Sequence, residues 1–271
     1  MRADDAEPGA LRAVSAGQAT YAATLIASGS LGLIKGDFTA IWTGVPKGFP
    51  AREALAYLTA VVALGTGIGL LRARTAALAS RVLLASYAIW FLLFRLPLLF
   101  RAPTSSGVWW ACGETAAMVA APWVLYVRFA GSRDSGRPGF AAGDRGLRVA
   151  TILYGLALIP FGIAHFTFLA RTVAMVPAWL PGHLFWAYFF GCTFVAAGLA
   201  IVAGVRARLA AVLSTLQMAL FTLLVWIPVM TAGRPSASDR TEFLGSCALT
   251  AIAWVVAESW GGNRSRAVPE G

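Results

Sequence analysis

Charged residues, histidine and cysteine are scarce in this sequence, and each shortage excludes a class of protein. Charged residues make up only 13% of the 271 residues, while apolar residues make up 58%, which argues against a soluble domain. The two histidines have no second strong metal ligand one helical turn away, so we expect no metal site. The three cysteines form no Cys-x-x-Cys pair, which argues against a thiol relay, and no haem or iron–sulfur ligand set is present.

The charged residues that do occur lie between long apolar stretches. A helix needs about 20 mainly apolar residues to cross about 30 Å of hydrocarbon. Eight stretches meet this requirement: residues 18–36, 53–71, 76–100, 107–127, 149–169, 184–204, 209–232 and 242–260. The sequence therefore predicts an all-α polytopic membrane protein with eight transmembrane helices, surrounded by membrane lipids.

The net charge of +10 is explained by orientation in the membrane. Basic residues accumulate on the cytoplasmic side of membrane proteins. With the eight spans in place, thirteen basic side chains fall on one side and seven on the other. We therefore expect both terminal tails, residues 1–17 and 261–271, and a Gly/Ser-rich linker, residues 131–148, in the cytoplasm. No basic stripe alternates with aromatic residues, so nucleic acid is not an expected partner.

The chain contains an internal repeat. The pattern V-P-x-x-[F/L]-P, followed by A-Y, occurs at residues 45–50 and again at residues 176–181, which lie 131 residues further along. Shorter matches follow in the same order: residues 71–77 with 205–211, and residues 95–97 with 226–228. A repeat of this length indicates a duplicated structural unit.

The repeat divides the chain into two units, residues 18–130 and 149–260, each with four spans. Because four is even, both units enter the membrane from the same side, and the repeats are parallel. Small residues at helical spacing, such as Gly155 and Gly162, indicate where helices approach closely in lipid. The sequence therefore predicts two tandem, parallel four-helix bundles.

His165 and Lys35 occupy matching positions in the two units. Gly162-x-x-His165 corresponds to Gly32-x-x-Lys35, and both lie near the non-cytoplasmic end of their spans. One interpretation is a hydrogen bond to a neighbouring carbonyl that fixes the bundle. The other is a ligand-binding or proton-exchanging group, because ionisable residues inside a membrane are costly and are often functional.

Glu114 is the only acid well inside a predicted span, and Arg95 lies at a comparable depth in the preceding span. An antiparallel neighbour could bring the two together as a structural ion pair, which would offset much of the desolvation cost. The alternatives are a substrate-facing pair, or a Glu114 that is solvated or protonated on its own.

The loops rich in proline and aromatic residues lie on the same outer side as these polar residues. Trp179 belongs to the second such loop and is expected in the aromatic belt of the membrane interface. The candidate pocket in the outer half of the bundles is thus formed by six residues: His165, Lys35, Glu114, Arg95, Trp179 and Asp37.

The second unit resembles DoxX-like membrane proteins. The resemblance rests on residues 162–166, 176–182, 186–188 and 206–211, and it is weaker in the first unit, where Lys35 stands in place of His165. It implies a bacterial plasma-membrane protein built of four-helix units. Some members of this family are subunits linked to thiosulfate and quinone oxidation, others assist disulfide or cofactor maturation, and no catalytic residue is carried over to this chain.

Three functions are consistent with these features. The first is an accessory, non-enzymatic membrane protein with a pocket for a quinone or a lipid. The second is the membrane subunit of a quinone-linked redox enzyme, which requires a partner subunit that carries the cofactor. The third is a small-solute transporter, which ranks last because no pair of interrupted helices is evident at mid-membrane depth.

Overall fold

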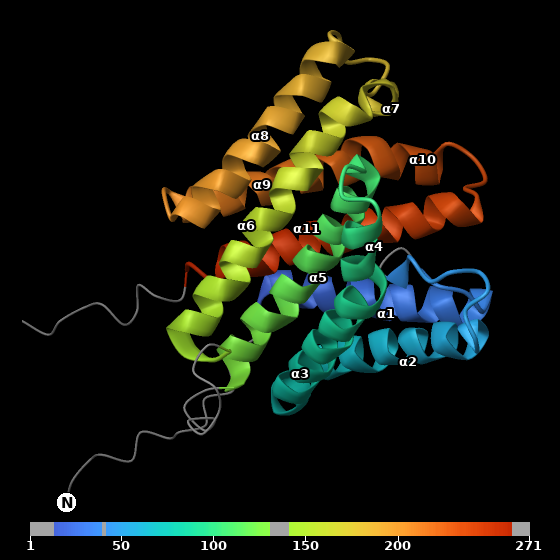
Figure 1. Ribbon diagram of the computed structural model, residues 1–271, viewed down its shortest axis with the longest axis vertical. Coiled ribbons are helices and arrows are strands. Elements are labelled where there is room, and N and C mark those ends of the chain that lie inside the picture. The colour runs from blue at the N-terminus through green and yellow to red at the C-terminus, as the bar shows by residue number, and fades with distance from the viewer. Residues whose placement is uncertain (1–13, 40–41, 131–140, 262–271) are drawn as a thin grey trace, which may run out of the picture.

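The computed structural model describes residues 14–39, 42–130 and 141–261, and every regular element within these ranges is helical (Figure 1). The predicted all-α class is confirmed. The elements, in chain order, are α1 (Ala16–Lys35), α2 (Arg52–Leu70), α3 (Ala73–Trp90), η2 (Phe91–Arg95), α4 (Leu96–Arg101), α5 (Ser106–Ala130), α6 (Gly143–Thr167), α7 (Leu169–Met175), α8 (His183–Ala203), α9 (Ala207–Phe221), η4 (Thr222–Trp226), α10 (Ile227–Thr231) and α11 (Ala237–Glu258).

Six helical segments of the described chain are long and apolar enough to cross a membrane. They are Arg52–Leu70, Ala73–Arg101, Gly143–Thr167, His183–Ala203, Ala207–Thr231 and Ala237–Glu258. The helices α1 and α5 are not among them, and each contains polar residues that lower its hydropathy, such as Gln18 in α1 and Glu114 in α5. The structure therefore supports a membrane protein, and the eight predicted spans go beyond these six segments.

The outer surface of the helices is apolar, the reverse of a soluble protein. Along α9 and its continuation, Leu209, Leu216 and Leu223 each leave about half of their surface exposed (49%, 53% and 53%). The buried faces instead contain many small residues, such as Ala117 and Ala121, which are fully buried. Small residues inside and large apolar residues outside are typical of helices that pack in lipid.

Two helical rods carry a π-helical interruption at matching places. The segment η2 joins α3 to α4, and the segment η4 joins α9 to α10. Pro97 follows the first and Pro228 follows the second at the start of the next helix. Proline has no backbone N–H and its ring clashes with the carbonyl one turn earlier, so the helix widens locally instead of continuing regularly.

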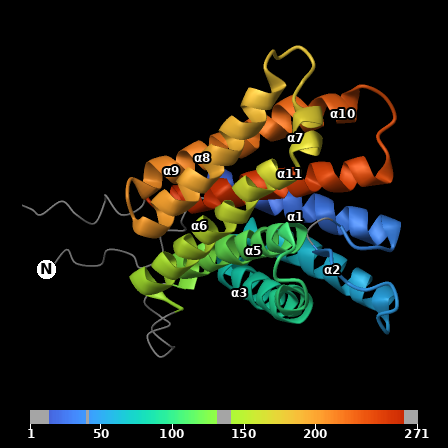
Figure 2. The ribbon, with the colours of Figure 1, turned by 45° about the horizontal axis from the view of Figure 1, so that its top comes forward.

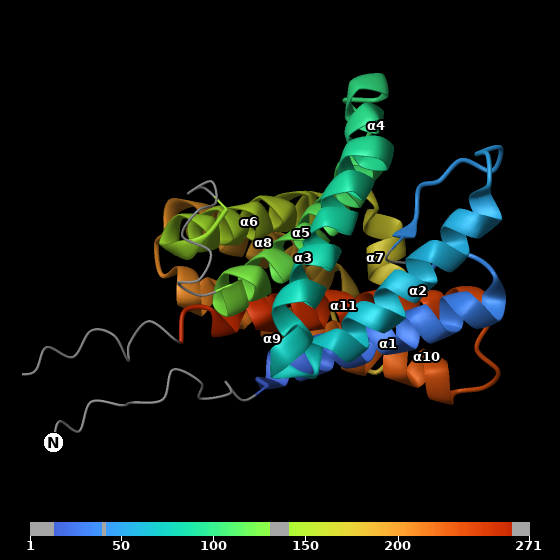
Figure 3. The same ribbon diagram turned by 90° about the horizontal axis from the view of Figure 1, so that it is seen from below.

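Each helix packs against its neighbours within its half, and the two halves contact each other through their first and last helices. In the first half α1 packs on α2, α2 on α3 and α3 on α5, and in the second half α6 packs on α8, α8 on α9 and α9 on α11. The halves meet where α5 packs on α6 and α11, and where α1 packs on α11. Figure 2 shows α11 next to both α9 and α1, and Figure 3 shows α1 alongside α11 from below. The last helix of each half is thus covered extensively by the first helix of the other half.

One cluster of polar contacts ties the halves together where α1 begins and α11 ends. Glu258 accepts hydrogen bonds from the backbone N–H of Gly17 (2.9 Å) and from the Ser15 hydroxyl (2.5 Å). Arg128, near the end of α5, approaches the same carboxylate at 3.9 Å. This carboxylate therefore joins three helices, α1, α5 and α11.

Glycines allow α6 and α8 to approach closely. Gly155 faces Gly198, and a Cβ atom on Gly198 would lie 2.6 Å from the Gly155 carbonyl oxygen. Gly162 faces Gly191, and a Cβ atom on Gly162 would lie 2.5 Å from the Gly191 carbonyl oxygen. The seven-residue spacing on both helices places the two pairs along one contact line, as the sequence indicated for Gly155 and Gly162.

Candidate functional site

Arg95 is the centre of a polar site inside the first half. It is the last residue of η2, and only 5% of its surface is exposed. Its Nε donates a hydrogen bond to the Thr115 hydroxyl on α5 (3.0 Å), and its Nη2 donates to the Thr43 hydroxyl (2.6 Å). The backbone carbonyl of Arg95 accepts a hydrogen bond from the Cys112 thiol (3.6 Å). A strongly basic group is therefore held in the interior by neutral partners.

The loop before α2 covers one side of the guanidinium. Trp90 fixes this loop because its Nε1 donates a hydrogen bond to the Thr43 carbonyl (3.1 Å). At the next residue, Gly44, φ is +98°, and a Cβ atom would lie 2.6 Å from Arg95 Nη1. Only glycine combines this backbone conformation with such close contact. The loop backbone thus packs directly against the guanidinium.

A chain of aromatic rings leads from this site to the surface. Trp42, which is 2% exposed, stacks on Tyr87 at 4.6 Å and meets Trp90 edge-on at 5.1 Å. Phe94 lies 4.6 Å from Trp90 and 5.5 Å from Phe49, and Phe49 is 39% exposed. Phe94 directly precedes Arg95 in η2. Aromatic side chains therefore pack between the charged site and the surface.

Glu114 does not form the predicted ion pair with Arg95. None of its oxygens lies within 4 Å of an Arg95 nitrogen, because Thr115, the next residue on α5, occupies the Nε position. Glu114 still interacts electrostatically with Arg95 and with Glu242 of α11. The interior thus contains an acid and a base close to each other but not in contact.

The other candidate residues have separate partners. Lys35 donates a hydrogen bond to the Thr241 hydroxyl on α11 (3.0 Å), and Asp37 forms an ion pair with Arg52 (2.9 Å). The Phe161 carbonyl oxygen, one turn earlier on the same helix α6, accepts a hydrogen bond from His165 Nδ1 (2.8 Å), so this bond does not join α6 to another helix.

Trp179 lies in the loop before α8 with 69% of its surface exposed, as suits a residue at the membrane interface. Among the six predicted pocket residues, the structure brings only Arg95 and Glu114 close enough to interact electrostatically. The other four have partners or surroundings elsewhere in the described chain.

Comparison with protein-family models, with curated proteins and with solved structures found no match to this chain. The resemblance to DoxX-like proteins stays a prediction.

Sequence reasoning missed the residues that hold Arg95. Thr115 directly follows the candidate Glu114 on α5, but it faces a different direction around the helix. Thr43 and Gly44 lie in a loop, and no sequence pattern places a loop against a particular helix.

The charged groups of the site are not arranged as a set of metal ligands. No group of three His, Cys, Asp or Glu residues that could hold a metal ion occurs in the part of the chain that the structure describes. Arg95 Nη1 makes no hydrogen bond within the described residues. A guanidinium can donate up to five hydrogen bonds in a fixed geometry, so some donors of Arg95 are not used by the described residues.

Proposed function

We propose that this chain is an accessory protein of the bacterial plasma membrane that binds the polar head of a lipid-soluble molecule, a quinone or a lipid, at Arg95. The observation that carries the proposal is a buried guanidinium that, within the described residues, has two neutral side-chain partners, no carboxylate within 4 Å and one nitrogen without a hydrogen bond.

Energetics support a ligand at this nitrogen. An arginine at the centre of a membrane helix costs about 2.5–3.5 kcal/mol on insertion scales. A hydrogen bond between membrane helices returns on average about 0.6 kcal/mol. The bonds to Thr43 and Thr115 therefore offset only part of the cost. A ligand oxygen on Nη1 would add a charge-assisted hydrogen bond, which is about twice as strong as a neutral one.

A quinone suits the surroundings better than a small solute. Its ring is flat and apolar and can pack against Phe94 and Phe49, while its carbonyl oxygen accepts a hydrogen bond from Arg95. Its isoprenoid tail would stay in the lipid. Glu114 lies nearby as the acid that would balance the charge of Arg95 or exchange a proton with the ligand.

The proposal includes eight membrane crossings in two parallel four-helix units, with both termini in the cytoplasm. The 131-residue sequence spacing supports two units, as do the π-helical segments of the same length before Pro97 and Pro228. Reporter fusions after residues 5, 140 and 265 test the topology. All three reporters are expected on the cytoplasmic side, and a reporter after residue 140 on the opposite side from residue 5 would exclude parallel units.

Binding is measured by titrating the purified protein with a short-chain benzoquinone and following tryptophan fluorescence, since Trp90 and Trp42 lie beside the site. Arg95→Gln is expected to weaken binding about tenfold or more, because hydrogen bonds to charged groups contribute about 1.5–3 kcal/mol. Arg81→Gln, which removes the same charge from the same rod, is the matched control and is expected to bind like the wild type.

The outcomes separate a quinone from a lipid. Organic extraction of the wild type and of Arg95→Gln identifies what co-purifies with each. If a phospholipid and no quinone is lost from the variant, the ligand is a lipid. Saturable quenching of equal strength in both proteins, with the same extracted lipids, would remove the basis of the proposal. Arg95→Lys keeps the positive charge with fewer donors, so intermediate binding by a folded Arg95→Lys protein distinguishes lost binding from lost folding.

A further inference from the structure

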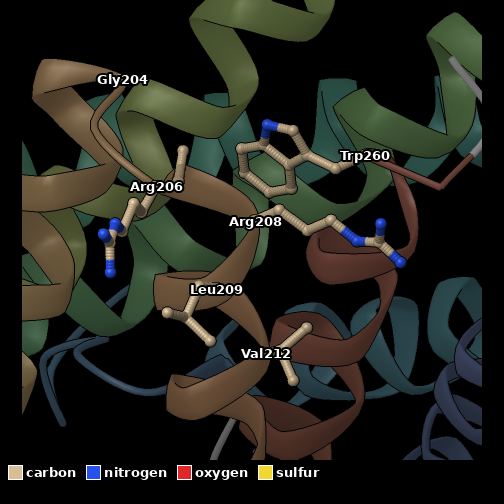
Figure 4. Close-up of a pocket in the computed structure, with 7 residues that line it drawn as sticks. Gly204, Arg206, Arg208, Leu209, Val212 and Trp260 are labelled. Carbon is tan, nitrogen blue, oxygen red and sulfur yellow. The ribbon is translucent and has the colours of Figure 1, made fainter. Parts of the chain in front are cut away.

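A second site lies at the end of the molecule where α6 and α9 begin and α8 and α11 end. Two adjoining pockets open there, with volumes of about 560 Å³ and 240 Å³. They share Gly204, Ala207 and Trp260 in their walls. Figure 4 shows the larger pocket, with the Trp260 indole above the start of α9. The hollow is therefore bounded by four helices of the second half.

The walls of this hollow are positively charged. Arg206 and Arg208 line the larger pocket, Arg148 lines the smaller one, and Asp144 is the one acid among the described lining residues. None of the three arginines lies within 4 Å of a carboxylate oxygen in the described part of the chain. Figure 4 shows that Arg206 and Arg208 extend to opposite sides of the pocket. The hollow thus offers several guanidinium groups that form no ion pair with an acid among residues 14–39, 42–130 and 141–261.

The backbone of the turn places the charges at the pocket. Gly204 has φ of +72°, and Arg206 has φ of +47°, a left-handed conformation that residues with a side chain rarely adopt. Arg206 is the N-cap residue of α9 and makes no side-chain capping hydrogen bond. Its guanidinium is therefore not used to hold the turn, although the backbone is strained there.

Below the charges the surface is apolar. Leu209 and Val212 form the floor of the larger pocket and are 49% and 46% exposed. The exposed apolar stripe continues along the same helix through Leu213, Leu216 and Leu220. A ligand that fits this site has a negatively charged head and a long apolar tail, and a soluble anion would use only the upper part.

We propose that this hollow binds an anionic phospholipid, with the phosphodiester between the arginines and an acyl chain along α9. Arginine recognises phosphate through paired hydrogen bonds, and basic pockets between membrane helices are known to suit anionic headgroups. Trp260 lies at the level of the headgroup, where tryptophan is favoured. The site is independent of Arg95, which lies on an earlier helical rod.

The test compares two double variants in detergent micelles. In Arg206→Gln/Arg208→Gln both charges of the larger pocket are removed. In Arg72→Gln/Arg74→Gln the same number of charges is removed from the α2–α3 turn, the corresponding turn of the first half. Native mass spectrometry counts the phosphatidylglycerol molecules that each protein retains during titration, with phosphatidylcholine as the neutral lipid.

Each arginine near an anionic lipid changes the affinity about fivefold, so the pocket variant is expected to bind phosphatidylglycerol about 30-fold more weakly. The turn variant is expected to bind like the wild type, and phosphatidylcholine is expected to bind equally to all three. Equal losses in both variants would show a general effect of surface charge and overturn the proposal. Unchanged binding in the pocket variant would overturn it as well.

Inorganic phosphate and glycerol 3-phosphate distinguish the source of the phosphate. If the hollow is a lipid site, neither at millimolar concentration displaces phosphatidylglycerol from the wild type. Complete displacement by either would assign the hollow to a soluble phosphate compound. Arg206→Gly removes one guanidinium and also relieves the left-handed strain. A protein that is at least as stable as the wild type but retains less phosphatidylglycerol separates binding from folding.

Discussion

The contact between Gly162 and Gly191 makes the substitution Gly162→Ala a sensitive test of the packing of α6 on α8. The added Cβ would lie 2.5 Å from the Gly191 carbonyl oxygen and from Val195 Cγ2. The carbonyl belongs to the backbone of a helix, so it cannot turn aside as the end of a side chain can. The two helices must therefore move apart.

The size of the effect follows from this geometry. An ordinary carbon–oxygen contact is at least 3.4 Å, so the helices must separate by about 0.9 Å. A gap of that size removes about a quarter to a half of the dispersion energy of the contacts around it, and overpacking of this kind costs about 1–3 kcal/mol. Alanine also stabilises a helix by about 1 kcal/mol relative to glycine. This gain partly offsets the steric cost in the measured stability.

A second glycine removes this ambiguity. Gly65 lies inside α2, and a Cβ atom there would meet nothing within 4 Å. Gly65→Ala therefore gains the helix preference without a clash. The difference in unfolding free energy between the two variants isolates the steric cost, and Gly162→Ala is expected to be less stable than Gly65→Ala by about 1–3 kcal/mol. Thermal and denaturant unfolding in the same detergent measure this difference. Equal stability of the two variants would refute the close approach of α6 and α8.

Three further predictions concern other parts of the molecule. Glu258→Ala is expected to lower stability by about 1–3 kcal/mol in detergent unfolding, because the Gly17 N–H and the Ser15 hydroxyl lose their acceptor. Arg206→Gly is expected to raise stability by about 1 kcal/mol in the same assay, because glycine adopts positive φ without strain. Cys192 is exposed in the structure, yet a charged maleimide is expected to label it only after the membrane is dissolved and the protein unfolded, because lipid covers α8.

The controls for these predictions come from the same chain. Glu53→Ala removes an exposed acid from the first turn of α2 and is expected to cost no more than about 1 kcal/mol. A loss as large as that of Glu258→Ala would mean that general charge, and not the contact between helices, is measured. Arg206→Ala keeps the strained backbone, so a gain in stability from it would contradict the explanation by φ. Rapid labelling of Cys192 in intact membranes would exclude α8 as a span.

The positions of most helices could be predicted from the sequence, because length and apolar composition determine where a helix can cross lipid. The stretch predicted at residues 53–71 is α2, Arg52–Leu70, and the stretch at residues 184–204 is α8, His183–Ala203. The internal form of the third stretch could not be predicted. Pro97 signals a disturbance one turn earlier, but whether the helix kinks or widens into a π-helix depends on neighbours that the sequence does not place.

The site was predictable only in part, for a similar reason. Arg95 and Glu114 could be identified because a charge within an apolar stretch is costly anywhere in lipid. Their partners depend on the path of a loop, and that path depends on how Trp42 packs between Tyr87 and Trp90. The similar depth of Arg95 and Glu114 in the predicted spans suggested a direct ion pair. In the structure the guanidinium instead donates a hydrogen bond to the hydroxyl of Thr115, the residue after Glu114.

In each half the last helix packs against the first helix of the other half: α5 lies against α6, and α11 lies against α1. This arrangement determines whether the protein can be assembled from two fragments. A polypeptide that stops at residue 130 would leave the α5 surface around Ala120 to contact acyl chains, and small side chains gain little there. Each fragment is then an obligate partner of the other. Produced together in one membrane, fragments 1–135 and 136–271 should associate and co-purify, and either one alone should be degraded.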